Sequence, residues 1–368
     1  MRPRSLRTLL ATVTAGLAAA GTLAAAGPSN ADALRNHVQN QAQNHTCSPA
    51  VSLDGFSDAL DKTTYEGTFV GNFSALAVDL PHSRLRSSGG TPTGSLLALS
   101  DRSALFSLDR RTLRPTGVVS LADAGGAALD SEGLVVDGDG TRLVTSETEP
   151  SVRRYDRAGR LLGGSLPVPD ALKVAPAGRA TTNQTFEGLT LYPGGRTLLA
   201  SMEGALSGDT AGIVRFQTWE RRYHGDFRLS AQYGYRADAG LGVVETAALP
   251  DGRLLVLERG FTAGVGNTVR LYLADPRRAT DTRGVENLTG QAGVRLIKKT
   301  LLTDLVTCPS LGATAKQAQP NPLLDNIEGM TITGRGPGGL RVLLVSDDNQ
   351  NAVQITRFYR LGVRLPAS

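Results

Sequence analysis

A short four-residue phrase recurs five times along this 368-residue chain, and four of its copies carry glutamate in the second place. The copies are Phe73-Ser74-Ala75-Leu76, Ser131-Glu132-Gly133-Leu134, Phe186-Glu187-Gly188-Leu189, Val244-Glu245-Thr246-Ala247 and Ile327-Glu328-Gly329-Met330. Each copy is followed by a second apolar run that ends in an acidic residue, namely Asp101, Glu147, Glu203, Glu258 or Asp347. Self-similarity of this kind is typical of propellers and solenoids, which repeat one supersecondary unit.

Within each unit, short apolar runs are separated by turn residues such as Asp137-Gly138 and Asp251-Gly252, which are hairpin signals. A third run follows in every unit, and a fourth is plausible in several. Helical periodicity is nearly absent, which argues against an α/β hydrolase or a TIM barrel. The sequence therefore predicts an all-β fold, a β-propeller of four-stranded antiparallel blades. A β-sandwich is the alternative, but it gives no reason for one phrase to recur with an acid in a fixed place.

The number of blades and the closure of the ring follow less directly from the sequence. Five blades are countable, and a sixth would fit in the long interval between Glu245 and Glu328. We interpret residues 275–293 and 309–323 as insertions, because they are rich in glycine, proline and polar residues. We expect residues 64–69 to add the missing strand of the last blade, so that N- and C-terminal strands pair and close the ring. The propeller domain is then predicted at residues 64–368, after an N-terminal segment at 34–63.

The first 33 residues have the pattern of a secretory signal peptide, with three arginines, an alanine-rich apolar centre and small residues after it. Cleavage is expected after Ala26 or Ala33. The apolar stretch is short for a spanning helix, which needs about 20 residues, and no later segment is apolar enough to cross a membrane. We therefore expect a secreted, extracellular bacterial protein.

The composition of the exported part limits its partners. Removal of residues 1–26 leaves 36 basic residues against 34 acidic ones, and the arginines are scattered, so no nucleic-acid partner is expected. Cys47 and Cys308 are the two cysteines of the chain, and in an exported protein we expect them to form a disulfide. We expect a monomer that acts on a small-molecule ester.

The repeated acids are predicted to meet at one mouth of the propeller channel. In each unit the glutamate opens a first strand and the second acid closes the next one, and these two points lie at the same end of an antiparallel hairpin. Crowded carboxylates need raised pKa values, a bound cation or paired arginines. Structural use of the glutamates, as ties to backbone amides of the next blade, is the alternative interpretation.

Carboxylate and amide oxygens suit calcium, whereas the lack of histidine and cysteine at these places disfavours zinc. We expect Glu147 or Glu203 to transfer a proton, and Arg102 and Arg259 to neutralise charge on the substrate. The predicted metal ligands are Glu132, Glu187, Glu245, Glu328 and Asp347.

Over residues 66–361 the chain resembles the phytase-like family, secreted bacterial proteins described by the phrase "esterase-like activity of phytase". The phrases that carry the resemblance are Leu99-Ser100-Asp101-Arg102, the Glu-Gly-Leu copies at Glu132 and Glu187, Leu257-Glu258-Arg259-Gly260-Phe261, Asp325-Asn326-Ile327-Glu328-Gly329-Met330 and Ser346-Asp347-Asp348-Asn349. The resemblance implies kinship with propeller phytases, which use calcium ions in an acidic channel mouth to hydrolyse phosphate esters.

The working hypothesis is a secreted hydrolase that cleaves phosphate or related esters with the help of a metal ion. Two alternatives stay open. One is a non-catalytic extracellular propeller that binds a glycan, a peptide or a protein. The other is a calcium-dependent lactonase.

Overall fold

The computed structural model describes residues 45–79, 94–222 and 225–366, so the predicted signal peptide and residues 34–44 of the N-terminal segment lie outside the described residues. The predicted all-β fold is confirmed. The described residues form 22 strands and two single-turn 3-10 helices, η1 (Asp170–Leu172) and η2 (Leu305–Thr307). Among the described residues, no helix is long and apolar enough to cross a membrane.

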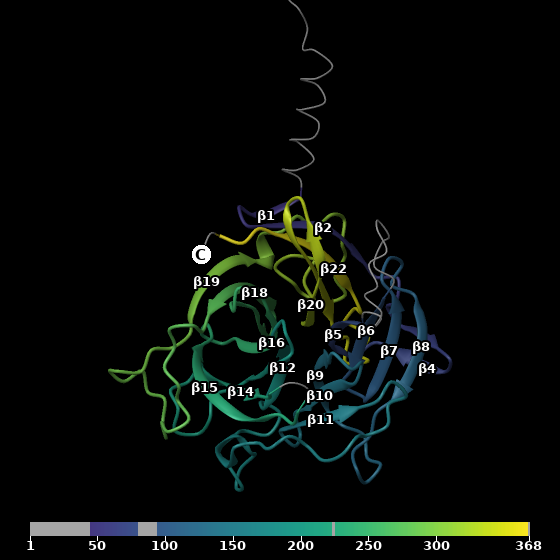
Figure 1. The fold of residues 1–368 in the computed structure, drawn as a ribbon. Coiled ribbons are helices and arrows are strands. Elements are labelled where there is room, and N and C mark those ends of the chain that lie inside the picture. Colours follow the sequence, from purple (N-terminus) through teal and green to yellow (C-terminus); the bar gives the residue numbers. More distant parts are fainter. Residues whose placement is uncertain (1–44, 80–93, 223–224, 367–368) are drawn as a thin grey trace, which may run out of the picture. The chain divides into compact units, whose positions relative to one another are not determined.

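The strands form five antiparallel blades arranged in a ring, which is the predicted β-propeller (Figure 1). Blade 1 contains β5 (Phe73–Asp79), β6 (Ser95–Ser100), β7 (Ala104–Asp109) and β8 (Pro115–Ser120). Blade 2 contains β9 (Ser131–Val136), β10 (Arg142–Ser146) and β11 (Ser151–Tyr155). Blade 3 contains β12 (Phe186–Leu191), β13 (Thr197–Met202), β14 (Ile213–Glu220) and β15 (Arg228–Arg236). Blade 4 contains β16 (Gly242–Ala248), β17 (Leu254–Thr262), β18 (Gly266–Asp275) and β19 (Lys298–Asp304).

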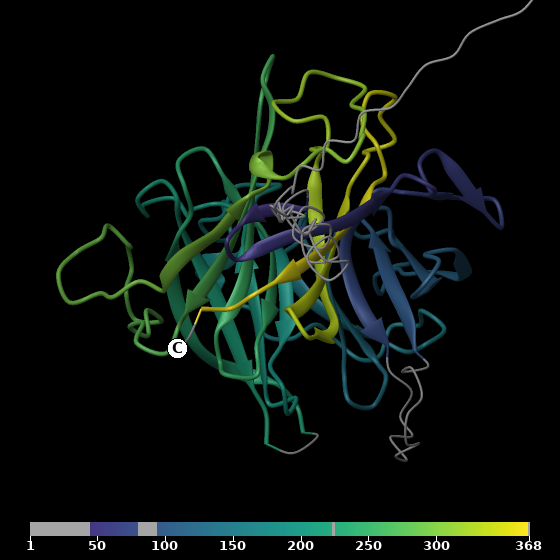
Figure 2. The ribbon, with the colours of Figure 1, turned by 90° about the horizontal axis from the view of Figure 1, so that it is seen from above.

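Blade 5 takes strands from both ends of the described chain. It contains β20 (Ile327–Gly336), β21 (Gly339–Ser346), β22 (Phe358–Val363), β2 (Val51–Ser57) and β1 (Thr46–Ser48). The predicted closure by N- and C-terminal strands therefore exists, and Figure 2 shows the purple β2 beside the yellow C-terminal strand.

The prediction of which strand closes the ring was wrong. Residues 64–69 lie in a separate two-stranded hairpin of β3 (Thr63–Tyr65) and β4 (Thr68–Val70). Its strands have three residues each and turn at Gly67, whose φ of 79° favours glycine. The seven residues of β2 offer a longer partner for β22, so the propeller begins near residue 46 and not at residue 64.

Blade 2 has three strands, not the four that were expected. Its outer edge has only a single bridge between Tyr155 and Leu161. Between β18 and β19, residues 276–297 form no strand, so the structure has five blades and not six.

The predicted disulfide between Cys47 and Cys308 is present. It joins β1 to the segment that follows η2, across 261 residues of sequence. In the chain-entropy model, closing so long a loop destabilises the unfolded chain by about 5 kcal/mol. The bond therefore reinforces the closure of the ring.

The first strands of the blades lie side by side around the channel, in the order β5, β9, β12, β16 and β20, with β20 next to β5. This close approach explains the glycine after the repeated glutamate. A Cβ atom on Gly133 would lie 2.5 Å from the carbonyl oxygen of Glu187, and one on Gly188 would lie 2.8 Å from the backbone nitrogen of Thr246. Glycine is therefore needed where the backbone of the next blade passes.

Buried aliphatic and aromatic side chains fill the space between blades. Phe73 of blade 1, for example, packs edge-on against Phe106 of its own blade at 5.6 Å and against Phe358 of blade 5 at 5.9 Å between ring centroids. All three rings are almost completely buried. Such contacts hold the blades at fixed positions around the channel.

Candidate functional site

Every blade has a β-bulge at the same end of its first hairpin. In blade 5, Ile327 pairs with Ser346 and Gly329 pairs with Val345, so Glu328 is an extra residue. The first two strands of the other four blades show the same irregularity. A bulge changes the direction of the side chain that it inserts, and here it turns the repeated position toward the channel mouth.

In each blade, the residue pair just before the bulge, such as Ile327 with Ser346 in blade 5, defines two positions. We call the residue after the first-strand member of this pair the inner position, and the residue after the second-strand member the outer position. The inner positions are Ser74, Glu132, Glu187, Val244 and Glu328. The outer positions are Asp101, Glu147, Glu203, Arg259 and Asp347. All of these residues except Val244 line one cavity of about 520 Å³.

Eight of the nine predicted site residues therefore share a single cavity. They are Arg102, Glu132, Glu147, Glu187, Glu203, Arg259, Glu328 and Asp347. The cavity lies at the end of the hairpins where the two acids of a unit meet, as the antiparallel pairing requires.

Glu245, which was predicted as a metal ligand, is the exception, because it does not line the cavity. In blade 4, Val243 pairs with Glu258, so the inner position falls on Val244. Compared with the other blades, the repeated acids of blade 4 have slipped by one residue along their strands. Such a slip sends a side chain to the opposite face of a strand. The carboxylate of Glu245 is buried and accepts hydrogen bonds from the backbone nitrogens of Leu189, at 3.2 Å, and Thr246, at 2.8 Å.

The same slip removes Glu258 from the cavity. Its carboxylate accepts hydrogen bonds from the hydroxyl of Tyr235 at 2.6 Å and from the backbone nitrogen of Asp238 at 2.8 Å. Arg259 then takes the outer position, which is acidic in the other four blades. In blade 4 the acids thus serve as structural ties, and an arginine faces the cavity.

Two groups of three carboxylates could hold a metal ion. In each group, oxygen atoms of all three residues lie within 4.8 Å of one another. The first group, which we call triad A, is Asp130, Glu132 and Glu147, and the second, triad B, is Glu147, Glu187 and Glu203. Glu147 belongs to both triads.

Asp130 was missed by the sequence analysis, although a signal for it exists. It lies two residues before Glu132, and Asn326 lies two residues before Glu328. Both side chains line the cavity. Oxygen-bearing residues at the same distance before two copies of the phrase could have identified this position.

Burial raises the pKa values of the four triad glutamates, and neighbouring carboxylates add to this effect for Glu132, Glu147 and Glu187. For Glu132 and Glu187, burial is the largest cause and neighbouring carboxylates add to it, so that both pKa values lie well above the usual range. Burial and the charge of Glu203 raise the pKa of Glu147 to about 7. Burial also raises the pKa of Glu203, while Arg259 opposes this effect.

On the side of the cavity formed by blades 5 and 1, Arg259 partly compensates the acids. Its Nη2 lies 2.9 Å from Oε1 of Glu328, whose pKa burial nevertheless raises to about 7. Burial together with the charge of Glu328 raises the pKa of Asp347 well above its usual value. Burial raises the pKa of Asp101 to about 6, and the side chain of Arg102 beside it is 65% exposed.

The lining fits a hard divalent cation. Eight carboxylates face two arginines, and the lining contains no histidine or cysteine. Oδ1 of Asp101 is buried without a hydrogen-bond partner among the described residues. Excess negative charge and oxygen donors within a few ångströms of one another are what calcium requires.

The fold and the site together define a five-bladed β-propeller with a carboxylate-lined cavity at one mouth of its channel. The family model that matches the chain is Phytase-like, described as "Esterase-like activity of phytase", and it covers residues 68–350. The chain belongs to this family. One stretch of 119 residues is 32% identical to an "Uncharacterized secreted protein" of Arthroderma benhamiae. That match covers 26% of this chain and 23% of the length of the relative.

Proposed function

We propose that this protein is a secreted hydrolase that cleaves phosphate or related esters with a divalent cation, calcium, held in the cavity. The observation that carries the proposal is the pair of carboxylate triads that share Glu147. Secretion is supported by the signal-like first 33 residues, by the disulfide and by the name of the Arthroderma relative.

The chain's own residues divide the work by their positions. The triad residues Asp130, Glu132, Glu147, Glu187 and Glu203 would hold the cation. When bound, a divalent cation polarises an ester oxygen and lowers the pKa of water. Since Glu147 and Glu203 then act as ligands, the proton-transfer role expected of them passes to a carboxyl outside the triads.

Asp101 is the residue that we assign to proton transfer. Its pKa of about 6 lets the carboxyl exchange a proton near neutral pH, and its Oδ1, which lies 3.5 Å from Nε of Arg102, accepts no hydrogen bond within the described chain. Arg259, held against Glu328, offers a buried cation for negative charge that develops on the substrate. Arg102, at the exposed edge of the cavity, adds a second, weaker positive charge.

The test is hydrolysis of p-nitrophenyl phosphate by the purified protein before and after chelation, followed by readdition of calcium. We expect chelation and Glu187→Gln each to lower turnover at least about a hundredfold, because both remove a preorganised charge. Glu149→Gln is the matched control, since this acid is 77% exposed and, among the described residues, pairs with Arg153 alone. Unchanged turnover after chelation and in Glu187→Gln would remove the metal mechanism.

A non-catalytic binding module is the second candidate, and Glu245 favours it. This acid of the repeat serves as a tie between blades 3 and 4, as the structural interpretation expects. A binding module would be stabilised by calcium yet hydrolyse no ester. Assaying lactones beside p-nitrophenyl phosphate separates a calcium-dependent lactonase from a phosphoesterase.

A further inference from the structure

The outer part of the cavity differs in chemistry from its acidic floor. We call four amide side chains and one ring the amide rim: Asn183, Gln317, Asn349, Gln354 and Phe261. The floor carboxylates are mostly buried, whereas the rim amides are exposed or half-buried and Phe261 is 54% exposed. The rim is therefore the part of the cavity that an entering molecule meets first.

The rim amides have free hydrogen-bonding capacity. No hydrogen bond joins the side-chain amides of these four residues to another described residue, whereas the amide of Asn326, deeper in the cavity, bonds to Glu328 at 3.0 Å. Each carboxamide presents donors and an acceptor together and carries no net charge. The rim thus offers paired donors and acceptors beside one aromatic face.

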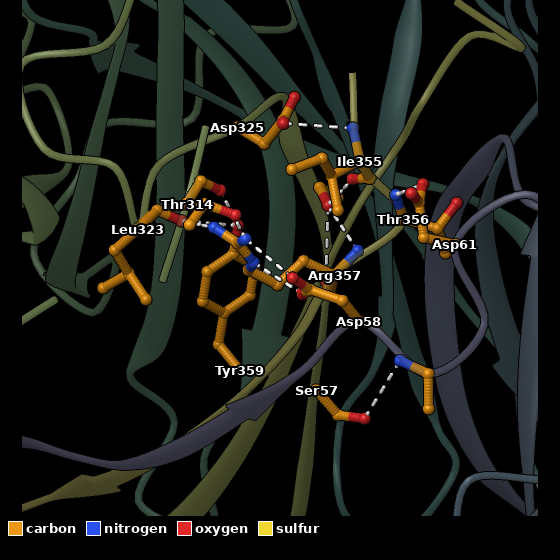
Figure 3. A network of polar contacts seen from close by, with 12 residues as sticks. Ser57, Asp58, Asp61, Thr314, Leu323, Asp325, Ile355, Thr356, Arg357 and Tyr359 are labelled. Atoms are coloured by element: carbon orange, nitrogen blue, oxygen red, sulfur yellow. Dashed lines mark hydrogen bonds and ion pairs between the residues drawn. The ribbon is translucent and has the colours of Figure 1, made fainter. Parts of the chain in front are cut away.

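Arg357 anchors the loops that carry three of the rim amides, and Figure 3 shows its polar contacts. The fully buried guanidinium of Arg357 donates to the carbonyl oxygens of Thr314 at 2.8 Å and Leu323 at 2.9 Å, and pairs with Asp58 at 2.6 Å. Residues 314–323 carry Gln317, and the chain that leads from β21 to Arg357 carries Asn349 and Gln354.

A second tie fixes the same loops to the N-terminal segment. Lys62 pairs with Asp348, the residue before Asn349. Lys316, the residue before Gln317, pairs with Asp61. The backbone nitrogen of Thr356 also donates to Asp61. Loops held in this way need little ordering when a ligand binds, which favours a binding surface over a mobile fringe.

We propose that the amide rim binds a neutral, polyhydroxylated part of the substrate, so that the substrate class is the monoester of a sugar or another polyol. This inference rests on the proposed function, which places the ester group on the acidic floor. A hydroxyl group both donates and accepts, so it matches a carboxamide on both sides. An apolar leaving group would leave the amides without partners, and a polyanionic one would bring further negative charge to a cavity in which eight carboxylates face two arginines.

Phe261 completes the match. Its exposed ring offers an apolar face against which the C–H face of a sugar ring can pack. A cavity of about 520 Å³ is within the range of sites for small molecules. An anionic ester group on the floor and a sugar at the rim thus fit one cavity.

The experiment compares two non-hydrolysable probes on the calcium-loaded full-length protein by titration calorimetry: phenylphosphonate and the phosphonate analogue of glucose 6-phosphate. We expect the sugar phosphonate to bind at least tenfold more tightly. Gln317→Leu and Gln354→Leu should each weaken its binding about three- to tenfold, the cost of one lost hydrogen bond, and should change phenylphosphonate binding less than twofold. Phe261→Ala should also weaken binding of the sugar phosphonate, because it removes the ring that packs against the sugar. Leu229→Ala, which alters a 41% exposed side chain of β15, is its control.

The outcomes separate this inference from the proposed hydrolysis. In one outcome, the protein prefers the sugar phosphonate through its rim and yet cleaves neither glucose 6-phosphate nor phenyl phosphate. That result supports the inference, whereas the hydrolase proposal fails. Equal KM for the two phosphates, with rim variants that change nothing, overturns the inference while hydrolysis stands. Absence of sugar phosphonate binding also overturns it.

Discussion

Nη2 of Arg259 lies 2.9 Å from Oε1 of Glu328 and joins blade 4 to blade 5 inside the cavity. The other four outer positions of the ring carry Asp101, Glu147, Glu203 and Asp347. Arg259 is thus the one cation in a ring of acids. Burial lowers its pKa, but the summed attraction of Glu328, Glu203 and the other nearby carboxylates is larger, so the pKa of Arg259 is raised.

Replacement of Arg259 should move activity and cation binding in opposite directions. In Arg259→Gln the substrate loses a buried cation, so kcat/KM should fall about a hundredfold. The cavity becomes more negative at the same time, so calcium should bind several-fold more tightly. Kinetics and calcium titration of one preparation check both effects. A fall in both quantities would contradict this role, and Arg259→Lys, which keeps the charge, is the control.

Glu245 and Glu187 should respond differently to the same substitution. Glu245→Gln retains an oxygen that can accept from Leu189 and Thr246, so the melting temperature and its rise with calcium should stay nearly unchanged. Glu245→Ala leaves two buried amides without a partner and should lower the free energy of unfolding by about 2 kcal/mol. Glu187→Gln should abolish the calcium-dependent rise, since Glu187 belongs to triad B. Loss of that rise in Glu245→Gln would show that Glu245 contributes to cation binding.

The stability of the metal-free protein should fall as pH rises toward neutrality. Glu147 and Glu328 have pKa values of about 7 in the folded protein against an ordinary value of 4.5. Between these values the folded state binds more protons than the unfolded state, so the free energy of unfolding decreases as pH increases. Thermal melting of the chelated protein across this range measures the slope.

Calcium should reverse that trend. Its ligands must be deprotonated, so its stabilising effect should be large at pH 7 and small near pH 4.5. A calcium effect that does not change between these two pH values would contradict carboxylate ligation. Glu147→Gln should flatten both profiles, because it removes one of the shifted groups.

Loss of the disulfide should weaken the fold but leave the cavity intact. The Cys47→Ser, Cys308→Ser double variant should lose about 2–5 kcal/mol of the free energy of unfolding, as is usual for a native disulfide. Its calcium affinity should match that of the parent, because the two cysteines do not line the cavity. Urea unfolding and calcium titration measure the two quantities. A parallel loss of affinity would show that the tie also shapes the site.

Most of the cavity could be predicted from the sequence because two acids recur at fixed places in each unit. Antiparallel pairing then brings residues such as Glu187 and Glu203 to one end of a hairpin without knowledge of any side-chain contact. Blade 4 shows where this reasoning stops. Val244 and Glu245 are adjacent, and only the bulge beside the pair of Val243 with Glu258 determines which of them faces the channel.

The closing strand could not be predicted for a different reason. Residues 64–69 were predicted to close the ring, whereas residues 51–57 are the ones that do so. The choice between them depends on pairing with β22, about 300 residues away, and local sequence carries no signal for that partner. The propeller itself follows from the repeat, whereas its closure is a tertiary event.

Blade 5 is built from the beginning and the end of the described chain, and it holds Glu328 and Asp347. These two acids lie at the same end of the β20–β21 hairpin, which is the last hairpin of the ring in chain order. However early the other four blades form, the part of the cavity wall that blade 5 supplies waits for this hairpin. A chain emerging in order from its N-terminus therefore completes its anionic chamber only after residue 347 has been made.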